Sequence, residues 1–233
     1  RLVVRQVDEN LGRRGIAGEV RPELPEPIAS AGAPLGEVVR REVETGGGDV
    51  VGVGKVPDIF AQHGISRAIK AHGVAALLAA TGTALAAGRD RALVFTNLVD
   101  FDQEHGHRRD VAGYARELES FDARLPGFLA GLGPGDLAIF TADHGNDPTW
   151  RGTDHTREHV PILVTGQAVA PQCIGIRDSF ADLGQSIAAW LGVGTLPTTG
   201  EQGEERVVMH RLAHKQPKVR PQRDAQVVES VTG

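Results

Sequence analysis

The stretch DFDQEHGHRRD, residues 100–110, has a residue pattern that could bind a metal ion. Asp102 and His107 lie five positions apart, with Gly106 between them. The backbone freedom of glycine lets such a loop fold back and turn both side chains towards one point. Polar loops are also common at strand ends, so this stretch alone does not separate a metal site from a solvated loop.

A second stretch, TADHGNDPTWRGTDHTREHVPILV (residues 141–164), carries the same residue types at higher density. Asp143 and His144 are adjacent, and His155 follows eleven positions after His144. Adjacent side chains point to opposite sides of an extended strand, but they converge where a strand bends into a loop, and Gly145 permits such a bend. The stretch then continues into an apolar segment that predicts a strand.

Together the two stretches offer two carboxylates and three imidazoles. This mixture suits Mn²⁺, Zn²⁺ or Fe²⁺ better than Ca²⁺ or a metal that prefers thiolates. Two such ions a few ångströms apart would stabilise both the attacking and the leaving oxygens in phosphoryl transfer. The sequence therefore predicts a metal site whose candidate ligands are Asp102, His107, Asp143, His144 and His155.

Nearby cations fit a phosphorylated substrate. Lys55 follows Gly54 at the end of the apolar run VVGVG, where its ammonium group could contact a phosphate; the alternative is a solvated lysine at a strand end. Three arginines also lie close in sequence to the candidate ligands. For these, structural ion pairs with Asp110, Asp154 or Glu158 are the favoured interpretation, and the three are Arg108, Arg109 and Arg157.

The elements that position these residues follow from apolar runs that alternate with helical patterns. Continuous apolar segments predict strands at residues 1–5, 49–55, 91–102, 137–145 and 160–165. Helical spacing predicts helices within residues 34–48, 65–88, 110–136 and 179–193, with a break near Gly82 and a kink or an end at Pro126.

This alternation predicts an α/β fold, a three-layer sandwich whose mostly parallel sheet is covered by helices on both faces. In such sheets ligands bind beyond the carboxyl ends of the strands. The strands predicted at 91–102 and 137–145 both end in candidate metal ligands. The expected parallel sheet therefore places the two polar stretches at one of its edges.

Composition excludes several other classes. The 233 residues carry a net charge of −5, which gives no reason to expect a nucleic-acid partner, and the single cysteine excludes an intramolecular disulfide framework. No apolar run reaches the roughly 18 residues of a membrane span, and no signal peptide is visible, so a cytoplasmic protein is expected. The GVGK segment lacks the P-loop pattern, and neither a dinucleotide fingerprint nor a Gly-x-Ser-x-Gly elbow occurs.

Several of these stretches resemble one family. NLVDFDQEHGHRRD and TADHGNDPTWRGTDHTREHVPIL closely resemble the phosphopentomutases, metal-dependent members of the alkaline phosphatase superfamily. GVGKVPDIFAQHGI resembles that family's Gly-Lys-Ile-x-Asp-Ile-Phe segment, and SFADLGQSIAAWLGV resembles its closing helix. The resemblance runs from about Asp49 to Gly200 and covers the C-terminal core part of the family only.

The resemblance implies an alkaline phosphatase-like core, two Mn²⁺ ions (Zn²⁺ or another divalent metal being the alternative) and a sugar phosphate substrate. The family interconverts ribose 1-phosphate and ribose 5-phosphate, and the deoxyribose equivalents, in nucleotide and pentose phosphate metabolism. Lys55 and Arg1 are implied as substrate-binding residues. Asp102, His107 and His155 are implied to bind one metal, and Asp143 and His144 to belong to the other.

The resemblance also implies residues that are not recognisable in this sequence. In the family the second metal takes a further aspartate from an N-terminal strand, and a phosphorylated threonine of the same half donates its phosphoryl group. The catalytic nucleophile is therefore unknown here, activity of this chain alone is doubtful, and a complementing N-terminal segment is a possible partner. The alternatives are another superfamily phosphatase, a phosphoglycerate mutase, or a non-catalytic metal-binding fragment.

The same resemblance divides the chain into three expected parts. Residues 1–30 are expected to be a remnant of a cap domain that is otherwise largely missing, or a linker. Residues 31–200 are expected to form the metal-binding core. Residues 201–233 differ in composition from the core, because the segment from Arg206 to Arg223 contains several Lys and Arg residues and no acidic residue. They are expected to be a disordered tail.

Overall fold

The computed structural model describes residues 2–6, 40, 43–89, 91–177 and 180–193. Residue Arg1, most of the helix expected at 34–48, the tail after residue 200 and the domain boundaries expected at 30 and 200 lie outside these ranges. Within the expected helix, residues 43–45 are helical. The division into three parts therefore stays a prediction.

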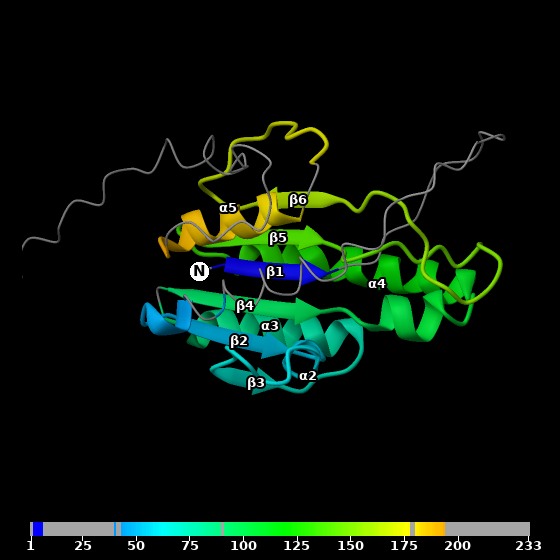
Figure 1. Cartoon of the computed structure of the whole chain (residues 1–233), viewed down its shortest axis with the longest axis horizontal. Helices are drawn as coiled ribbons and strands as arrows, with labels where there is room; N and C mark the ends of the chain where they lie inside the picture. The colour runs from blue at the N-terminus through cyan, green and yellow to red at the C-terminus, as the bar shows by residue number, and fades with distance from the viewer. Residues whose placement is uncertain (1, 7–39, 41–42, 90, 178–179, 194–233) are drawn as a thin grey trace, which may run out of the picture.

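A six-stranded sheet forms the centre of the molecule, with the strand order β3-β2-β4-β1-β5-β6 (Figure 1). Five strands are parallel, and β6 runs antiparallel to β5 at one edge. The strand expected at the start of the chain forms and pairs with both β4 and β5. The strands are β1 (Leu2–Gln6), β2 (Asp49–Val53), β3 (Arg67–Ile69), β4 (Ala92–Asn97), β5 (Leu137–Thr141) and β6 (Ile162–Thr165).

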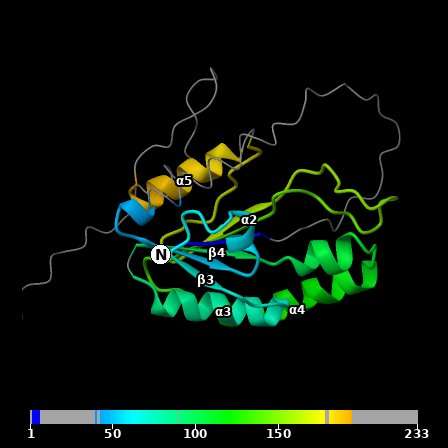
Figure 2. The same ribbon diagram turned by 60° about the horizontal axis from the view of Figure 1, so that its bottom comes forward.

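Helices cover both faces of this sheet, so the expected three-layer α/β fold is confirmed (Figure 2). Helices α3 and α4 lie on one face, and α5 lies on the other (Figure 2). The helical elements are α2 (Val56–Ile59), α3 (Val74–Ala87), the π-helical turn η2 (Phe101–Gly106), α4 (Val111–Ala130) and α5 (Ala181–Leu191). Among the described residues, no helix is both long and apolar enough to cross a bilayer.

Two hydrophobic clusters hold the layers together, one on each face of the sheet. One cluster joins the sheet to α3 and α4, and includes Leu77, Val94 and Tyr114. The other joins the sheet to α5, and includes Ile139 and Ala188. Strand β5 is buried along its whole length because both of its faces contribute to a cluster. This double burial explains why the strands read as continuous apolar runs rather than alternating ones.

The carboxyl ends of the three central strands are level with one another. Gln6 at the end of β1 lies opposite Asn97 of β4 and Thr141 of β5. The chain continues from Asn97 into η2 and from Thr141 into the loop that leads to β6. Both polar stretches therefore leave the sheet at the same edge.

The segment expected as one helix over residues 65–88 contains two elements, so this prediction is wrong in its first half. Residues Arg67–Ile69 form β3, and α3 begins only at Val74. The Ser66 hydroxyl bonds both the N–H and the carbonyl of Val50, at 2.7 and 2.8 Å, which holds the start of β3 beside β2. Gly73, at φ +79°, then turns the chain into the helix.

Neither expected interruption ends a helix. Helix α3 continues through Gly82, where an added Cβ would meet no atom within 4 Å, and the cost of glycine inside a helix is only about 1 kcal/mol. Helix α4 continues past Pro126 to Ala130. Packing of the apolar stripes of both helices against the sheet outweighs these local costs.

The core on the α3 side predicts a difference between two leucine truncations. Leu77 is fully buried, whereas Leu163 on edge strand β6 is 56% exposed. We expect Leu77→Ala to lower the free energy of unfolding by about 2–5 kcal/mol, because it leaves a cavity. The matched control Leu163→Ala should cost less than about 1 kcal/mol. Chemical denaturation measures both values, and equal losses would contradict the described packing.

Candidate metal centre

The π-helical turn η2 positions Asp102 and His107. Phe101 at its start is fully buried and packs edge-to-face on Tyr114 of α4, with the ring centroids 5.3 Å apart, which anchors the turn to the core. The backbone N–H of His107 donates to the carbonyl of Asp102 at 2.9 Å, so the turn closes with both side chains at one end. Single π-helical turns of this kind are frequent at functional sites.

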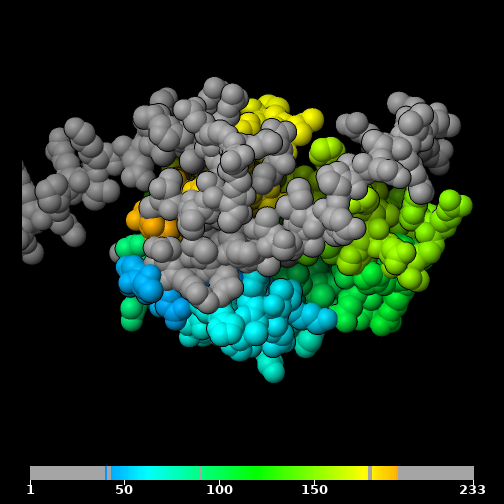
Figure 3. Space-filling model, viewed as in Figure 1, coloured from blue at the N-terminus to red at the C-terminus, as the bar shows by residue number. Residues whose placement is uncertain are grey.

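The loop between β5 and β6 returns to its starting point. Gly145 and Thr156 form an isolated antiparallel bridge, in which the N–H of Thr156 donates to the carbonyl of Gly145 at 2.8 Å. The bridge sets His144 beside His155, whose rings stack at a centroid distance of 3.7 Å and an angle of 18°. The loop (yellow-green) reaches the molecular surface next to the green residues of the α4 region (Figure 3).

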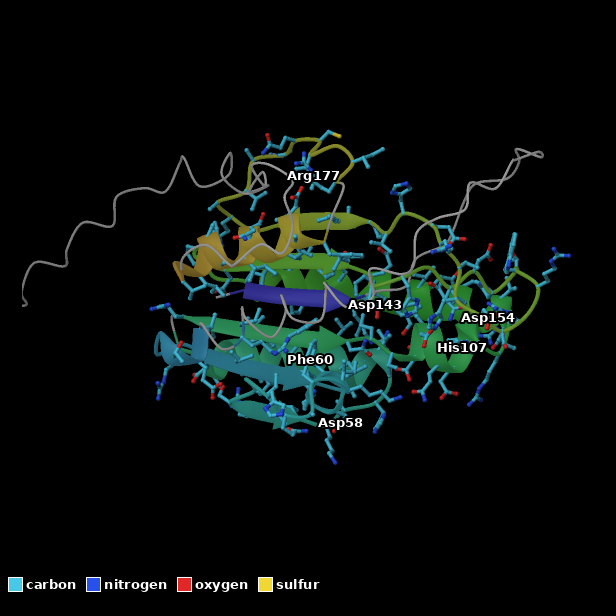
Figure 4. All side chains as sticks on the ribbon, viewed as in Figure 1. Asp58, Phe60, His107, Asp143, Asp154 and Arg177 are labelled. Carbon is cyan, nitrogen blue, oxygen red and sulfur yellow. The ribbon has the colours of Figure 1, made fainter. Side chains whose placement is uncertain are left out.

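Three of the five candidate ligands converge. The Nε2 atoms of His107 and His155 lie 3.4 and 3.2 Å from Oδ1 of Asp102, and 3.0 Å from each other. One ligand atom from each residue thus falls within 4.8 Å of the others. The Asp102 side chain is 22% exposed and the two histidines 38% and 44%, so an ion could enter from solvent. Figure 4 shows His107 at the end of the molecule beyond the strand arrowheads.

A backbone carbonyl determines the tautomer of His107. Its Nδ1 atom lies 2.7 Å from the carbonyl oxygen of Thr153. A carbonyl can only accept a hydrogen bond, so Nδ1 carries a proton, and Nε2, which faces Asp102 and His155, is the nitrogen left to bind an ion. Histidines that bind metals are commonly oriented in this way, by a hydrogen bond on the nitrogen that faces away from the ion.

The donor set fits a divalent metal ion. One carboxylate oxygen and two imidazole nitrogens lie 3.0–3.4 Å from one another, a spacing that one ion with metal–ligand distances of about 2.0–2.2 Å can bridge. Such electron-rich atoms stay together only if a proton or a cation lies among them. One carboxylate with two imidazoles is also a set of ligands that first-row divalent metals accept.

Asp143 and His144 adjoin this group but do not join it. Nε2 of His144 lies 3.5 Å from Oδ1 of Asp143, and its Nδ1 lies 3.2 Å from the carbonyl oxygen of Gly145. Asp143 lies between the strand ends and His107 (Figure 4). The structure thus separates the five candidates into a group of three and an adjacent pair, joined by the stacked rings of His144 and His155.

The surroundings of His155 lower the pKa of its imidazole below the ordinary value. Partial burial is the largest cause, and the neighbouring rings of His144 and His107 act in the same direction. The carboxylates of Asp102 and Asp143 oppose the shift without cancelling it. The shift favours the neutral imidazole of His155, which is the form that binds a metal.

Lys55 lies at the same edge, one residue after the left-handed Gly54. Its ammonium group donates to Oε1 of Gln103 at 2.7 Å, and Gln103 follows Asp102 in η2. The lysine thus lies next to the metal group without touching it. The second substrate-binding residue expected from the sequence, Arg1, lies outside the described residues.

Arg109 plays a structural part that the sequence did not predict. Its guanidinium group donates to backbone carbonyls and not to the expected carboxylates: Nε to Gly152 at 2.5 Å, Nη1 to Asp147 at 2.8 Å and Nη2 to Asp154 at 2.8 Å. These bonds fasten the loop that carries His155 to the turn after η2. Arg108, by contrast, pairs with Glu104 at 2.9 Å, not with Asp110, Asp154 or Glu158.

Asn146 is a second residue that sequence reasoning missed. Its side chain is fully buried, and it hydrogen-bonds both Asp102 and Arg109. The sequence held one sign of this role, because Asn146 directly follows the Asp143-His144-Gly145 bend and is therefore close in sequence to two candidate ligands. Its role depends on a contact across 44 residues, which no local pattern reveals.

Comparison with known proteins identifies the family of this chain. The Metalloenzyme superfamily matches residues 54–195. Proteins named phosphopentomutase from Shewanella loihica and Methylobacterium radiotolerans are 55% and 58% identical to this chain over 160 and 161 residues, which is 69% of this chain in both cases. The chain spans about 40% of the length of these curated relatives.

A solved structure shares the fold. A phosphoglycerate mutase from Leishmania mexicana superposes with a TM-score of 0.51 at 18% identity, covering 68% of this chain and 37% of that one. At this identity the likeness concerns the fold alone. Together with the family match, it agrees with the alkaline phosphatase-like core that the sequence predicted.

The convergence of three ligand atoms predicts metal binding that depends on His155. We expect the chain to bind Mn²⁺ or Zn²⁺, and His155→Ala to weaken binding by more than about 100-fold, since it removes a ligand rather than the support of one. The control His63→Ala, an exposed histidine away from the group, should leave affinity unchanged. Calorimetric titration measures all three proteins, and equal affinities of parent and His155→Ala would refute the site.

The lowered pKa of His155 predicts how metal-free stability changes with pH. Below the ordinary value of about 6.5, the unfolded chain binds this proton more readily than the folded chain does. The contribution of neutral His155 to the free energy of unfolding is therefore fully present above about pH 6.5, and it is lost as the pH falls towards the pKa of the folded state. His155→Gln should lose less stability than the parent between pH 7.5 and 5 in denaturant titrations. An NMR titration that places His155 above 6.5 in the metal-free chain would contradict this prediction.

Proposed function

The chain belongs to the metalloenzyme superfamily, and from this premise we propose that its metal centre serves a phosphopentomutase. The reaction would interconvert ribose 1-phosphate and ribose 5-phosphate, and the deoxyribose equivalents, as an isomerisation by phosphoryl transfer. The observation that carries the proposal is the convergence of Asp102, His107 and His155 beyond the carboxyl ends of parallel strands, with Lys55 beside them. Relatives that are 55% and 58% identical over 69% of this chain bear that name.

In this proposal two Mn²⁺ ions occupy the centre. Asp102, His107 and His155 would hold one ion, while Asp143 and His144 would contribute to the second. When bound, the ions supply positive charge that stabilises the oxygens between which a phosphoryl group passes. The stacking of His144 on His155 supports two adjacent sites, because it places one histidine of each proposed set in direct contact.

The remaining residues would bind and orient the substrate. Lys55 projects from the edge of the sheet near the metal group, and its present partner, the neutral side chain of Gln103, is easily exchanged for a phosphate. An ammonium group is a compact charge with three donors, which suits a phosphate oxygen. The sugar phosphate would thus lie between Lys55 and the ions, in the position that parallel sheets offer to ligands.

Not all catalytic groups of a phosphopentomutase are recognisable in these 233 residues. The chain spans about 40% of the length of its curated relatives. We propose that the nucleophilic threonine and a further aspartate of the second metal come from a complementing N-terminal segment. The chain alone would then bind metal and substrate without interconverting the two sugar phosphates. The cytoplasmic location and the place in nucleotide metabolism stay predictions from the sequence.

Substrate binding tests the proposal independently of turnover. With Mn²⁺ present, we expect Lys55→Gln to weaken binding of ribose 5-phosphate by about 10-fold or more, the equivalent of one lost charge-assisted hydrogen bond. Mn²⁺ affinity should be unchanged, because Lys55 does not touch the ligands. Lys70→Gln, at another exposed lysine, is the matched control. Calorimetry or competition with a labelled sugar phosphate provides the affinities.

Three results would each contradict a part of this proposal. Tighter binding of 3-phosphoglycerate than of ribose 5-phosphate would favour a phosphoglycerate mutase instead. Interconversion of ribose 1-phosphate and ribose 5-phosphate by the purified chain alone, with Mn²⁺, would show that no complementing segment is needed. Binding of neither sugar phosphate, with metal binding intact, would leave a non-catalytic metal-binding fragment.

A further inference from the structure

Asn146 joins two parts of the centre that are far apart in sequence. Its Nδ2 atom donates to Oδ1 of Asp102 at 2.5 Å, and its Oδ1 atom accepts from Nη1 of Arg109 at 3.0 Å. Oδ1 of Asp102 is the same oxygen that His107 and His155 approach. The amide therefore touches the carboxylate at the atom that would bind the metal.

The direction of these two hydrogen bonds is determined by chemistry. A guanidinium group has only donors, so the atom of Asn146 that faces Arg109 must be the amide oxygen. The NH₂ group then faces Asp102, whose ionised carboxylate has only acceptors. Both neighbours thus permit only one orientation of the amide. In that orientation, which Arg109 fixes, Asn146 donates a hydrogen bond to Asp102.

Packing holds the amide in place as well. Asn146 is 0% exposed and lies against the backbone of Gly106 in η2. A Cβ atom added at Gly106 would come within 2.3 Å of Nδ2 and 2.5 Å of Cγ of Asn146. The glycine leaves the space that the amide occupies, so the side chain cannot be displaced without moving the turn that carries Asp102.

The Arg109 side chain that orients the Asn146 amide is itself held firmly in place. Its backbone is in the left-handed region, at φ +55°, and its guanidinium group has three further carbonyl partners in the loop that carries His155. The strength of such charge-assisted hydrogen bonds exceeds that of neutral ones. If the Asn146 amide flipped, its NH₂ group would face the N–H donors of Arg109. The Arg109 side chain is held by its other hydrogen bonds and would not move away.

We propose that Asn146, oriented by Arg109, is a positioning residue for the metal ligand Asp102. Its N–H group occupies one lone-pair site of Oδ1, so the remaining site of that oxygen points to the position between His107 and His155. Asp102 then binds the ion through a preset oxygen rather than by rotating onto it. The inference rests on the metal centre of the proposed function, and it assigns the support of that centre to a residue that does not touch the ion.

The test uses two substitutions at Asn146 and two measurements. Asn146→Leu keeps the branching and the number of heavy atoms of the side chain and removes both hydrogen bonds, and Asn146→Ala removes them while leaving space. We expect both variants to bind Mn²⁺ about 10–100-fold more weakly, the range for loss of a group that orients a ligand. The visible absorption of bound Co²⁺, which reports the arrangement of the ligands, should also change in both.

Thr81→Val is the control. Thr81 is fully buried in α3, where its hydroxyl donates to the carbonyl of Leu77 at 2.6 Å and lies 2.8 Å from the hydroxyl of Thr96. The substitution thus removes buried hydrogen bonds from the core without changing a residue of the metal group or of the two segments that carry it. It should lower the denaturation midpoint of the chain while leaving the Co²⁺ spectrum of the parent intact.

The possible outcomes separate positioning from general stability. Asn146 variants that fold and bind Mn²⁺ within about threefold of the parent, with an unchanged Co²⁺ spectrum, would overturn the proposal, since the loss expected is at least 10-fold. An equal spectral change in Thr81→Val would also overturn it, as would loss of cooperative unfolding in both Asn146 variants, because either result assigns Asn146 to the fold. Failure of the parent chain to bind Mn²⁺ would instead refute the proposed function.

Discussion

Two imidazole nitrogens and one amide group approach a single carboxylate oxygen, Oδ1 of Asp102, from different directions. The amide is a hydrogen-bond donor and stabilises the carboxylate, but the lone pairs of the two imidazole nitrogens and the carboxylate oxygen repel one another unless a proton or a cation lies among them. The π-helical turn holds two of the groups, and the loop after β5 holds the other two. Most of the polar contacts at this end of the described structure serve to keep these two segments together.

The sheet makes that arrangement possible by bringing the two segments to one place. Parallel strands β4 and β5 flank β1 and end level with it, so η2 and the β5–β6 loop start at the same edge. The antiparallel direction of β6 then matters, because a strand that runs back must begin where β5 ends, with Ile162 opposite Thr141. The loop is thus anchored at both of its ends next to the metal group, and His155 lies on its return half.

The sequence predicted the fold class and the meeting of the two polar stretches because both depend on strong local signals. Continuous apolar runs indicate buried strands, and polar residues directly after such runs must lie at the carboxyl edge. The three-residue strand β3 escaped prediction because its identity depends on hydrogen bonds from Ser66 to Val50 in a neighbouring strand. Arg109 was misread for a similar reason: three of its partners are backbone carbonyl oxygens, which every residue possesses and no sequence pattern marks.

The Gly145–Thr156 bridge divides the β5–β6 loop into a stem and a tip. His144 and His155 flank the bridge, and the contacts of Arg109 and His107 tie residues 152–154 to the turn after η2, whereas Trp150 at the tip is 56% exposed. The spacing of the two histidines thus depends on contacts of the stem and not on the residues between 148 and 151. The exposed tip forms the surface that incoming molecules meet, while the stem holds the metal group.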